Sequence, residues 1–255
     1  MCELTVILPA YNEEDNISEL TERWQNEKER LEKEGGCRLR IVAVNDGSSD
    51  NTEKIARKLE EEYDNFTLVN HDSNKGLGEA VKTGILYTLD KFPSCEYTCI
   101  MDCDNTHDPR FVHSMLKKQR EAKADVVIAS RYQNGSRIKG VSSFRLFTSE
   151  GARYVYSLLL GVKNVRDYTC GYRLYNNDIL KKAHERFGGE LIQESGFSCM
   201  AELLYKLYAS GASFAEVPFE LRYDFKKGAS KMKVIKTAID SFKLAYRLRK
   251  IPLEV

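Results

Sequence analysis

Residues 97–104 read YTCIMDCD, an apolar run that ends in two carboxylates separated by one residue. In a β-strand, residues i and i+2 point the same way, so Asp102 and Asp104 are predicted to project together where the strand ends. The carboxyl edge of a parallel sheet is where α/β proteins place their ligand sites. Two hard oxygen donors there suit Mg²⁺ or Mn²⁺, held partly by the phosphates of a bound nucleotide. The same tripeptide also occurs in solvated turns, so the surrounding sequence has to distinguish the two.

Apolar segments of strand length alternate with amphipathic helical segments on both sides of this stretch. Strands are predicted at residues 4–8, 40–44, 66–69, 97–101, 125–129 and 213–218, and helices at about 17–34, 52–63, 78–92, 110–122, 144–160, 197–209 and 233–250. The βαβα order of the first half predicts an α/β fold with a mostly parallel central sheet flanked by helices. Nearly continuous apolar strands suit a sheet covered on both faces. Without repeats, linkers or low-complexity runs, the chain is predicted to form one domain.

The composition excludes several classes of protein. At 255 residues the chain can bury a sizeable core, and 39 Lys and Arg nearly balance 38 Asp and Glu, so no net charge indicates a nucleic-acid partner. Seven cysteines without paired spacing do not indicate a secreted disulfide framework, and we expect them to be reduced. A strand begins almost at the N-terminus and no apolar run approaches about 20 residues, so neither a signal peptide nor a membrane span is predicted.

Polar residues that a hydrophobic core does not need follow the first two strands. PAYNEE follows the first strand at residues 9–14, and NDGSSD follows the second at residues 45–50. One such loop would be ordinary helix capping. Three loops that converge on one sheet edge, with a flat aromatic ring and several carboxylates, can instead bind a base, ribose hydroxyls and a metal-bound diphosphate.

A glycine-containing segment, NKGLGEA at residues 74–80, follows the third strand. It has neither the Gly-x-Gly-x-x-Gly spacing nor the P-loop spacing. Gly76 therefore indicates a turn and Gly78 a tight helix start, with direct phosphate binding as the alternative.

The order of these motifs resembles that of a known family. The motifs are Pro9–Glu13, Asn45–Asp50, Asn74–Gly78, Asp102–Asp104, Ser130–Tyr132, Thr169–Arg173, Glu216–Pro218 and Lys227–Lys231. Together they are similar to family-2 glycosyltransferases, and within them to the dolichyl-phosphate mannose synthase group, which also makes polyprenyl-phosphate glucose. The resemblance covers nearly the whole chain.

The resemblance implies a GT-A fold over residues 1–232, with a nucleotide-binding half followed by an acceptor-binding half. It further implies inverting transfer of a mannose- or glucose-type hexose from a nucleoside-diphosphate sugar to a polyprenyl or dolichyl phosphate. The implied roles fall into three groups. Pro9, Tyr11, Glu13 and Asp46 would hold the nucleoside, with Lys75 and Gly76 also binding substrate; Asp102 and Asp104 would bind the metal; Arg131, Arg173, Ser230 and Lys231 would face the acceptor phosphate.

Two positions depart from the family pattern. Asn45 stands where the family often has the first of two aspartates, which changes a ribose or base contact. Lys227 stands where an arginine is common before the glycine, and a lysine cannot bind phosphate in the bidentate way of arginine.

The implied chemistry needs no dedicated base, because a lipid phosphate is already anionic and can attack the anomeric carbon directly. A divalent metal would stabilise the departing diphosphate, and we expect Asp102, Asp104, Arg131 and Arg173 to be the catalytic residues. A saccharide or other hydroxyl acceptor would instead require a carboxylate base, for which Glu194 and Glu202 are the candidates.

The alternative to that base assignment is simpler. Glu202 is interpreted first as a helix carboxylate paired with an arginine, and Asp167 as a residue that either orients Arg173 or caps a turn. A nucleotide-sugar-binding protein without catalysis is a further alternative. The intact acidic pair argues against it.

Residues 233–255 are predicted to form a basic amphipathic helix. Its apolar positions recur at helical spacing: Ile235, Ala238, Ile239, Phe242, Ala245 and Leu248. The helix either packs on the domain with its lysines in water or rests on a membrane surface. The second alternative predicts a cytoplasmic protein that is peripheral on the inner face of a membrane. The sequence leaves the oligomeric state open.

Overall fold

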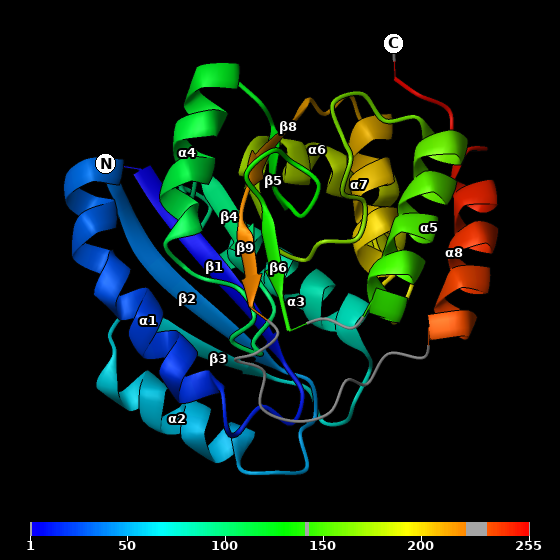
Figure 1. Cartoon of the computed structure of the whole chain (residues 1–255). Helices are drawn as coiled ribbons and strands as arrows, with labels where there is room; N and C mark the ends of the chain where they lie inside the picture. The colour runs from blue at the N-terminus through cyan, green and yellow to red at the C-terminus, as the bar shows by residue number, and fades with distance from the viewer. Residues whose placement is uncertain (1, 141–142, 223–233, 255) are drawn as a thin grey trace.

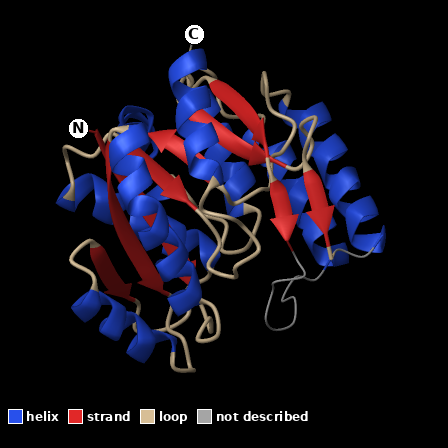
Figure 2. Cartoon of the chain, turned by 60° about the vertical axis from the view of Figure 1, so that its left-hand side comes forward, coloured by secondary structure: helices blue, strands red, loops and turns tan. Residues whose placement is uncertain are grey.

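A computed structural model describes residues 2–140, 143–222 and 234–254. Its centre is a seven-stranded sheet with the order β3-β2-β1-β4-β7-β5-β8 (Figure 1). The strands of this sheet are β1 (Cys2–Ala10), β2 (Cys37–Asn45), β3 (Phe66–Asn70), β4 (Tyr97–Ile100), β5 (Val126–Ser130), β7 (Arg173–Asn176) and β8 (Phe214–Pro218). Two short parallel strands, β6 (Arg137–Lys139) and β9 (Glu220–Arg222), form a separate ribbon that Figure 2 shows beside the main sheet.

Helices cover both faces of the sheet, as the apolar strands predict. Residues 4–10 of β1 are buried without interruption, which requires packing on both sides. The helical elements are α1 (Ile17–Arg30), a π-helical turn (Leu31–Gly35), α2 (Thr52–Glu62), α3 (Leu77–Lys91), α4 (Phe111–Ala122), α5 (Ser143–Leu160), α6 (Asn177–Phe187), a 3₁₀ turn (Gly188–Glu190), α7 (Cys199–Ala209) and α8 (Val234–Leu248). The predicted α/β class and mostly parallel sheet are therefore confirmed.

The strands predicted from the sequence include none at Arg173, where the structure has one. β7 begins at that residue and runs antiparallel to both β4 and β5, whereas the other neighbours in the main sheet pair in parallel. Because β7 is antiparallel, its first residue lies opposite Ile100 and Ile128, near the carboxyl ends of β4 and β5. The segment that precedes β7 is thereby brought to the same sheet edge as the acidic pair.

The cysteines differ from the prediction that all are reduced. Cys2 and Cys37 form a disulfide between the first residues of β1 and β2, with their Cα atoms 4.4 Å apart. The parallel register pairs these two residues directly, which sequence spacing cannot reveal. The other five cysteines are free and buried.

Helix α8 packs against α5 and α7, and the two helices α5 and α8 lie side by side at one end of the molecule (Figure 1). Its packed face contains Leu244, Ala245 and Leu248, while Phe242, which the sequence placed on that face, is 55% exposed. In the described part of the chain, no helix has both the length and the apolar character needed to cross a membrane. The predicted boundary at residue 232 lies outside the described residues.

Candidate functional site

The loops that follow β1, β2 and β4 meet at one edge of the sheet, as predicted. Ala10 pairs with Asn45 and Ile7 with Ile100, so these strands end close together. The first two loops are also joined to each other, because the Asn12 amide donates to Ser48 Oγ at 2.9 Å. In return, Asn12 Oδ1 accepts from the amide of Ser49 at 2.8 Å. The loops after β1 and β2 are thus connected to each other rather than independent turns.

The Asp46 carboxylate organises the glycine-containing segment. It is buried, and it accepts the main-chain amides of Lys75 at 2.9 Å and Gly76 at 2.8 Å. His71 Nδ1 lies 2.7 Å from the same carboxylate, and its Nε2 lies 2.9 Å from Thr83 Oγ1. Sequence reasoning missed His71, which no motif includes.

Gly76 directly precedes α3 and has a backbone conformation that favours glycine. Its φ is +93°, and a Cβ there would lie 2.5 Å from the carbonyl oxygen of Ser195. The segment around Gly76 is therefore pressed against the chain that precedes α7, and a side chain would disrupt both the backbone and this contact.

The other residues predicted for the donor differ in accessibility. Tyr11 is 36% exposed beside the loop of Asn12, and the Lys75 side chain is exposed. Pro9 is buried within β1, and Glu13 accepts a hydrogen bond from Asn16 Nδ2 at 2.7 Å. An aromatic face and an ammonium group thus border the edge where Asp46 holds the turn.

The acidic pair lies in the loop after β4, at residues 101–110, which we call the acidic loop. Asp104 is buried and its Oδ1 accepts the hydroxyl of Thr106 at 2.6 Å and the amide of Thr106 at 3.2 Å. Asp102 is half-buried and lies against Gly171, where a Cβ would come within 2.7 Å of Oδ1. Both carboxylates are therefore positioned by neighbours that the Asp-x-Asp pattern does not include.

The donor set fits a hard divalent cation. Among the described residues, no cluster of three His, Cys, Asp or Glu side chains could enclose a metal ion by itself. Mg²⁺ bound with substrate phosphates uses only one or two carboxylates and keeps several waters, so a pair such as Asp102 and Asp104 suffices. His107 follows closely; burial lowers its pKa and so favours the neutral imidazole, and its ring packs on Tyr172 at 5.6 Å between centroids.

Arg131, which is partly exposed, and the fully buried Asp167 form an ion pair beside the acidic loop. The Arg131 Nε and Nη2 atoms donate to Asp167 at 2.8 and 2.6 Å, and Nη2 also donates to Thr169 Oγ1 at 2.6 Å. Burial alone would raise the pKa of Asp167, but the charge and hydrogen bonds of Arg131 outweigh it and hold this pKa below 3.8. Asp167 also accepts the amide of Cys170 at 3.0 Å, so its predicted role as a turn cap is confirmed.

Glu216 stabilises the segment that carries Asp167, the partner of Arg131. Its Oε1 accepts the amides of Arg166 at 2.7 Å and Asp167 at 2.8 Å, and its Oε2 accepts from Gln133 at 2.9 Å. The sequence identified Glu216 only as part of a family motif, without a role. In the structure it fixes the start of the turn that holds Arg131.

Arg173 does not lie where an acceptor phosphate could reach it in this conformation. It is fully buried, and its two terminal nitrogens donate to the carbonyls of Met200 at 2.6 Å and Tyr168 at 2.7 Å. The expectation that it faces the acceptor does not fit this burial. Arg173 instead joins the segment before β7 to α7. Ser230, Lys231 and Lys227 lie outside the described residues.

The two carboxylates considered as bases have structural partners. Glu202 is fully buried, pairs with Lys206 at 2.7 Å and lies 3.5 Å from Arg247, which confirms the simpler interpretation. It also accepts the amides of Gln193 and Glu194 at 2.8 Å. The Glu194 carboxylate accepts from Ser198 at 2.9 Å and from Arg247 at 2.9 Å.

Comparisons with known proteins identify the family of the chain. Residues 5–183 match the model of glycosyl transferase family 2. The chain is 30% identical over 253 residues to a dolichyl-phosphate β-glucosyltransferase from Trichomonas vaginalis, covering 95% of this chain and 72% of that one. It is 28% identical over 248 residues to a dolichol-phosphate mannosyltransferase from Pyrococcus furiosus, covering 97% of this chain and 64% of that one. The chain thus spans less than two thirds of this second relative.

Among solved structures, glucosyl-3-phosphoglycerate synthase from Mycobacterium tuberculosis in complex with Mn²⁺ and UDP-glucose superimposes with a TM-score of 0.65. The match covers 100% of this chain and 80% of that one at 17% sequence identity. At this identity the similarity concerns the fold.

Proposed function

The chain belongs to glycosyl transferase family 2 and is a glycosyltransferase, and from this premise we propose that it transfers a hexose to a polyprenyl or dolichyl phosphate. It has the GT-A fold of its structural neighbours. The proposed donor is a nucleoside-diphosphate sugar of the mannose or glucose type, and the transfer inverts the anomeric centre. The observation that carries the proposal is the meeting, at one sheet edge, of the acidic pair with the turn that holds Arg131.

The donor is proposed to bind over the loops after β1, β2 and β3. Tyr11 offers an exposed ring for the base, with Pro9 and Glu13 at its side. Asp46 contributes by fixing Lys75 and Gly76, since its carboxylate is already bound to their amides.

Asp102 and Asp104 would hold Mg²⁺ or Mn²⁺ together with the donor diphosphate. When bound, such an ion acts as a Lewis acid that stabilises the negative charge of the leaving diphosphate. The chain's own contribution is to hold the two carboxylates, Asp104 through Thr106 and Asp102 against Gly171. Carboxylates that are already positioned bind without a reorganisation cost.

The acceptor phosphate is proposed to approach from the side of Arg131. Its guanidinium keeps its positive charge, because interaction with Asp167 outweighs the burial that would lower its pKa. Ser230 and Lys231 are proposed to complete this site, and Arg173 to position the turn by holding Tyr168. The acceptor needs no base because a phosphate is already ionised at neutral pH.

The α5–α8 end of the molecule is proposed to rest on the cytoplasmic face of a membrane, where polyprenyl phosphates reside. Phe242 and Tyr246 of α8 are 55% and 54% exposed, and Leu158 of α5 is 85% exposed. Exposed Lys243, Arg247 and Lys250 flank these side chains and suit anionic lipid headgroups.

The test is transfer by the purified protein from radiolabelled GDP-mannose or UDP-glucose, with Mn²⁺, to a short polyprenyl phosphate. We expect one of these donors to yield a lipid-linked hexose, and Asp104→Ala to abolish turnover while leaving the fold intact. Full activity of that variant, or activity in excess chelator, would refute the metal site. Transfer only to saccharides, with a rate that falls as a carboxylate is protonated, would instead identify a hydroxyl acceptor and a base.

A further inference from the structure

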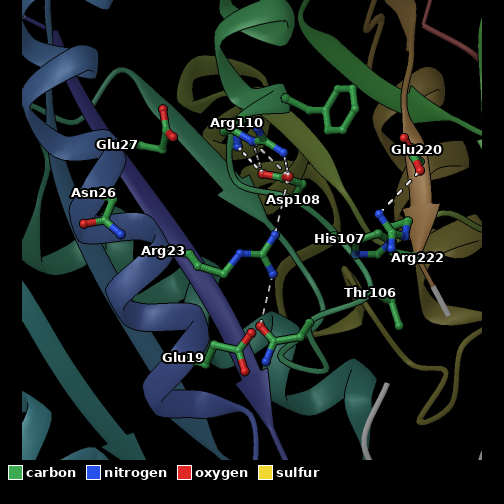
Figure 3. Close-up of a pocket in the computed structure, with 12 residues that line it drawn as sticks. Glu19, Arg23, Asn26, Glu27, Thr106, His107, Asp108, Arg110, Glu220 and Arg222 are labelled. Carbon is green, nitrogen blue, oxygen red and sulfur yellow. Dashed lines mark hydrogen bonds and ion pairs between the residues drawn. The ribbon is translucent and has the colours of Figure 1, made fainter. Parts of the chain in front are cut away.

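A cavity lies on the α1 side of the acidic loop. Its volume is about 450 Å³, and it is bounded by α1, by residues 105–111 and by β9 (Figure 3). None of its lining residues is one of those proposed above for the donor, the metal or the acceptor phosphate. Cavities of this size hold small organic ligands.

Most of the charged groups of this cavity already have ion-pair partners. Asp108 accepts from Arg110 Nη2 at 2.6 Å and lies 3.5 Å from Arg23 Nη2. Across the cavity, Arg222 lies 3.7 Å from Glu220, whose other partner is Lys139. Figure 3 shows Arg23 and Asp108 on one side of the space and Arg222 on the other.

The lining as a whole carries no surplus of positive charge. Three arginines stand against four carboxylates, the remaining two being Glu19 and Glu27, and Glu27 lies 2.8 Å from His113 Nε2. An anionic ligand would have to displace these pairs. A neutral ligand would not, because paired guanidinium and carboxylate groups keep N–H atoms and lone pairs for hydroxyl groups, each of which both donates and accepts.

The cavity also offers aromatic rings and a preformed floor. Phe111 and His107 line it, and both rings are held by Phe219 at centroid distances of 6.0 and 5.5 Å. Asn105 accepts from Arg23 at 3.3 Å, and the carbonyl of Thr106 accepts the amide of Arg222 at 3.0 Å. A rigid floor lowers the entropy lost on binding.

We propose that this cavity is a binding site for a neutral pyranose sugar, separate from the donor site. The sugar hydroxyls hydrogen-bond to the paired side chains of Arg23, Asp108 and Arg222, and the apolar face of the ring lies on an aromatic side chain. The site is independent of the proposed transfer reaction, because it requires neither nucleotide nor metal.

Binding of methyl α-mannopyranoside and methyl α-glucopyranoside, measured by calorimetry and by the amide NMR shifts of Asn105 and Thr106, tests this inference. We expect saturable millimolar binding of at least one of them to the wild-type protein. Asn26→Trp, which adds a ring to the cavity wall on α1, should weaken binding about tenfold or more. Glu19→Ala is a milder second variant that should weaken it in the same direction.

The control is Glu22→Trp, since Glu22 is an exposed α1 residue that does not line the cavity, and it should leave the affinity unchanged. Asp102→Ala removes the carboxylate of the proposed metal pair that lies against Gly171, outside the cavity lining, so it should be inactive in transfer and still bind the glycoside. Absence of saturable binding overturns the inference. So does loss of binding in Asp102→Ala with retention in Asn26→Trp, which would place the sugar in the donor site. Displacement by inorganic phosphate would reveal an anion site and overturn it as well.

Discussion

The carboxylate of Asp102 lies directly against the main chain of Gly171. A Cβ at residue 171 would come within 2.7 Å of Asp102 Oδ1 and 3.3 Å of Oδ2. The contact exists because antiparallel β7 returns the preceding segment to the end of β4. The absence of a side chain at residue 171 is therefore a condition for the position of the first carboxylate of the acidic pair.

Gly171→Ala is expected to displace Asp102 and to weaken both Mn²⁺ binding and transfer. A loss of about tenfold corresponds to about 1.4 kcal/mol, a modest cost for moving a carboxylate away from the ion. Mn²⁺ affinity by electron paramagnetic resonance and the transfer rate measure the effect. Gly189→Ala is the matched control, because nothing lies within 4 Å of a Cβ there. Equal behaviour of the two variants would show that the contact does not position Asp102.

Asp167→Asn is expected to lower the free energy of unfolding by about 3–5 kcal/mol, because it leaves the Arg131 charge without its buried partner. Urea denaturation measures the change. Glu53→Gln breaks an exposed pair with Arg57 and should cost less than about 1 kcal/mol. A similar small cost for both variants would mean that Arg131 finds other partners.

The same pair predicts a pH dependence. The pKa of Asp167 is lowered in the folded protein from its ordinary 3.8, so its contribution to stability is complete above that value. The contribution is lost as the pH falls through the lower, folded-state pKa. The stability difference between wild type and Asp167→Asn should be constant from about pH 6 to 8 and shrink below about pH 4. A difference that does not change in acid would indicate that folding does not lower the pKa of Asp167.

Gly76→Ala is expected to raise the KM for the nucleotide sugar, because a Cβ there would meet the carbonyl of Ser195 at 2.5 Å and move the turn bound by Asp46. Gly188→Ala separates the effect of this contact from the effect of backbone strain. Its φ of +53° is also in the left-handed region, but nothing lies within 4 Å of its Cβ. Donor KM should rise several-fold in the first variant and stay unchanged in the second, and a rise in both would point to backbone strain alone.

The first half of the fold could be predicted because its first two strands are long and mostly apolar. β1 and β2 each have nine residues, mostly apolar, and each is followed by a helix, so the parallel order follows from connection rules. β7 has only four residues, RLYN, and begins with a buried arginine. Neither its length nor its periodicity distinguishes it from a loop, and its antiparallel direction is decided by its neighbours.

In the candidate site, the sequence likewise identified residues but not the partners that they contact. The sequence identified Arg131 and Asp167 but not their pairing, because 36 positions separate them and β7 brings them together. The family resemblance implied that Arg173 faces the acceptor phosphate, whereas the structure buries this residue. The carbonyls of Met200 and Tyr168 hold its guanidinium there, and their positions depend on tertiary structure.

Phe242 and Tyr246 give the last prediction. Their exposed rings should insert into a lipid surface, and replacing both by serine is expected to lower binding to vesicles of anionic phospholipid about tenfold or more. Flotation of the purified protein with vesicles measures the bound fraction, and added salt should weaken it through the flanking lysines and arginines. Tyr63→Ser is the control and should leave flotation unchanged, because Tyr63 directly follows α2, a helix that lies away from α8 in Figure 1. If the wild-type protein does not float with anionic vesicles, or if the double variant floats equally well, α8 packs on the domain without contacting lipid.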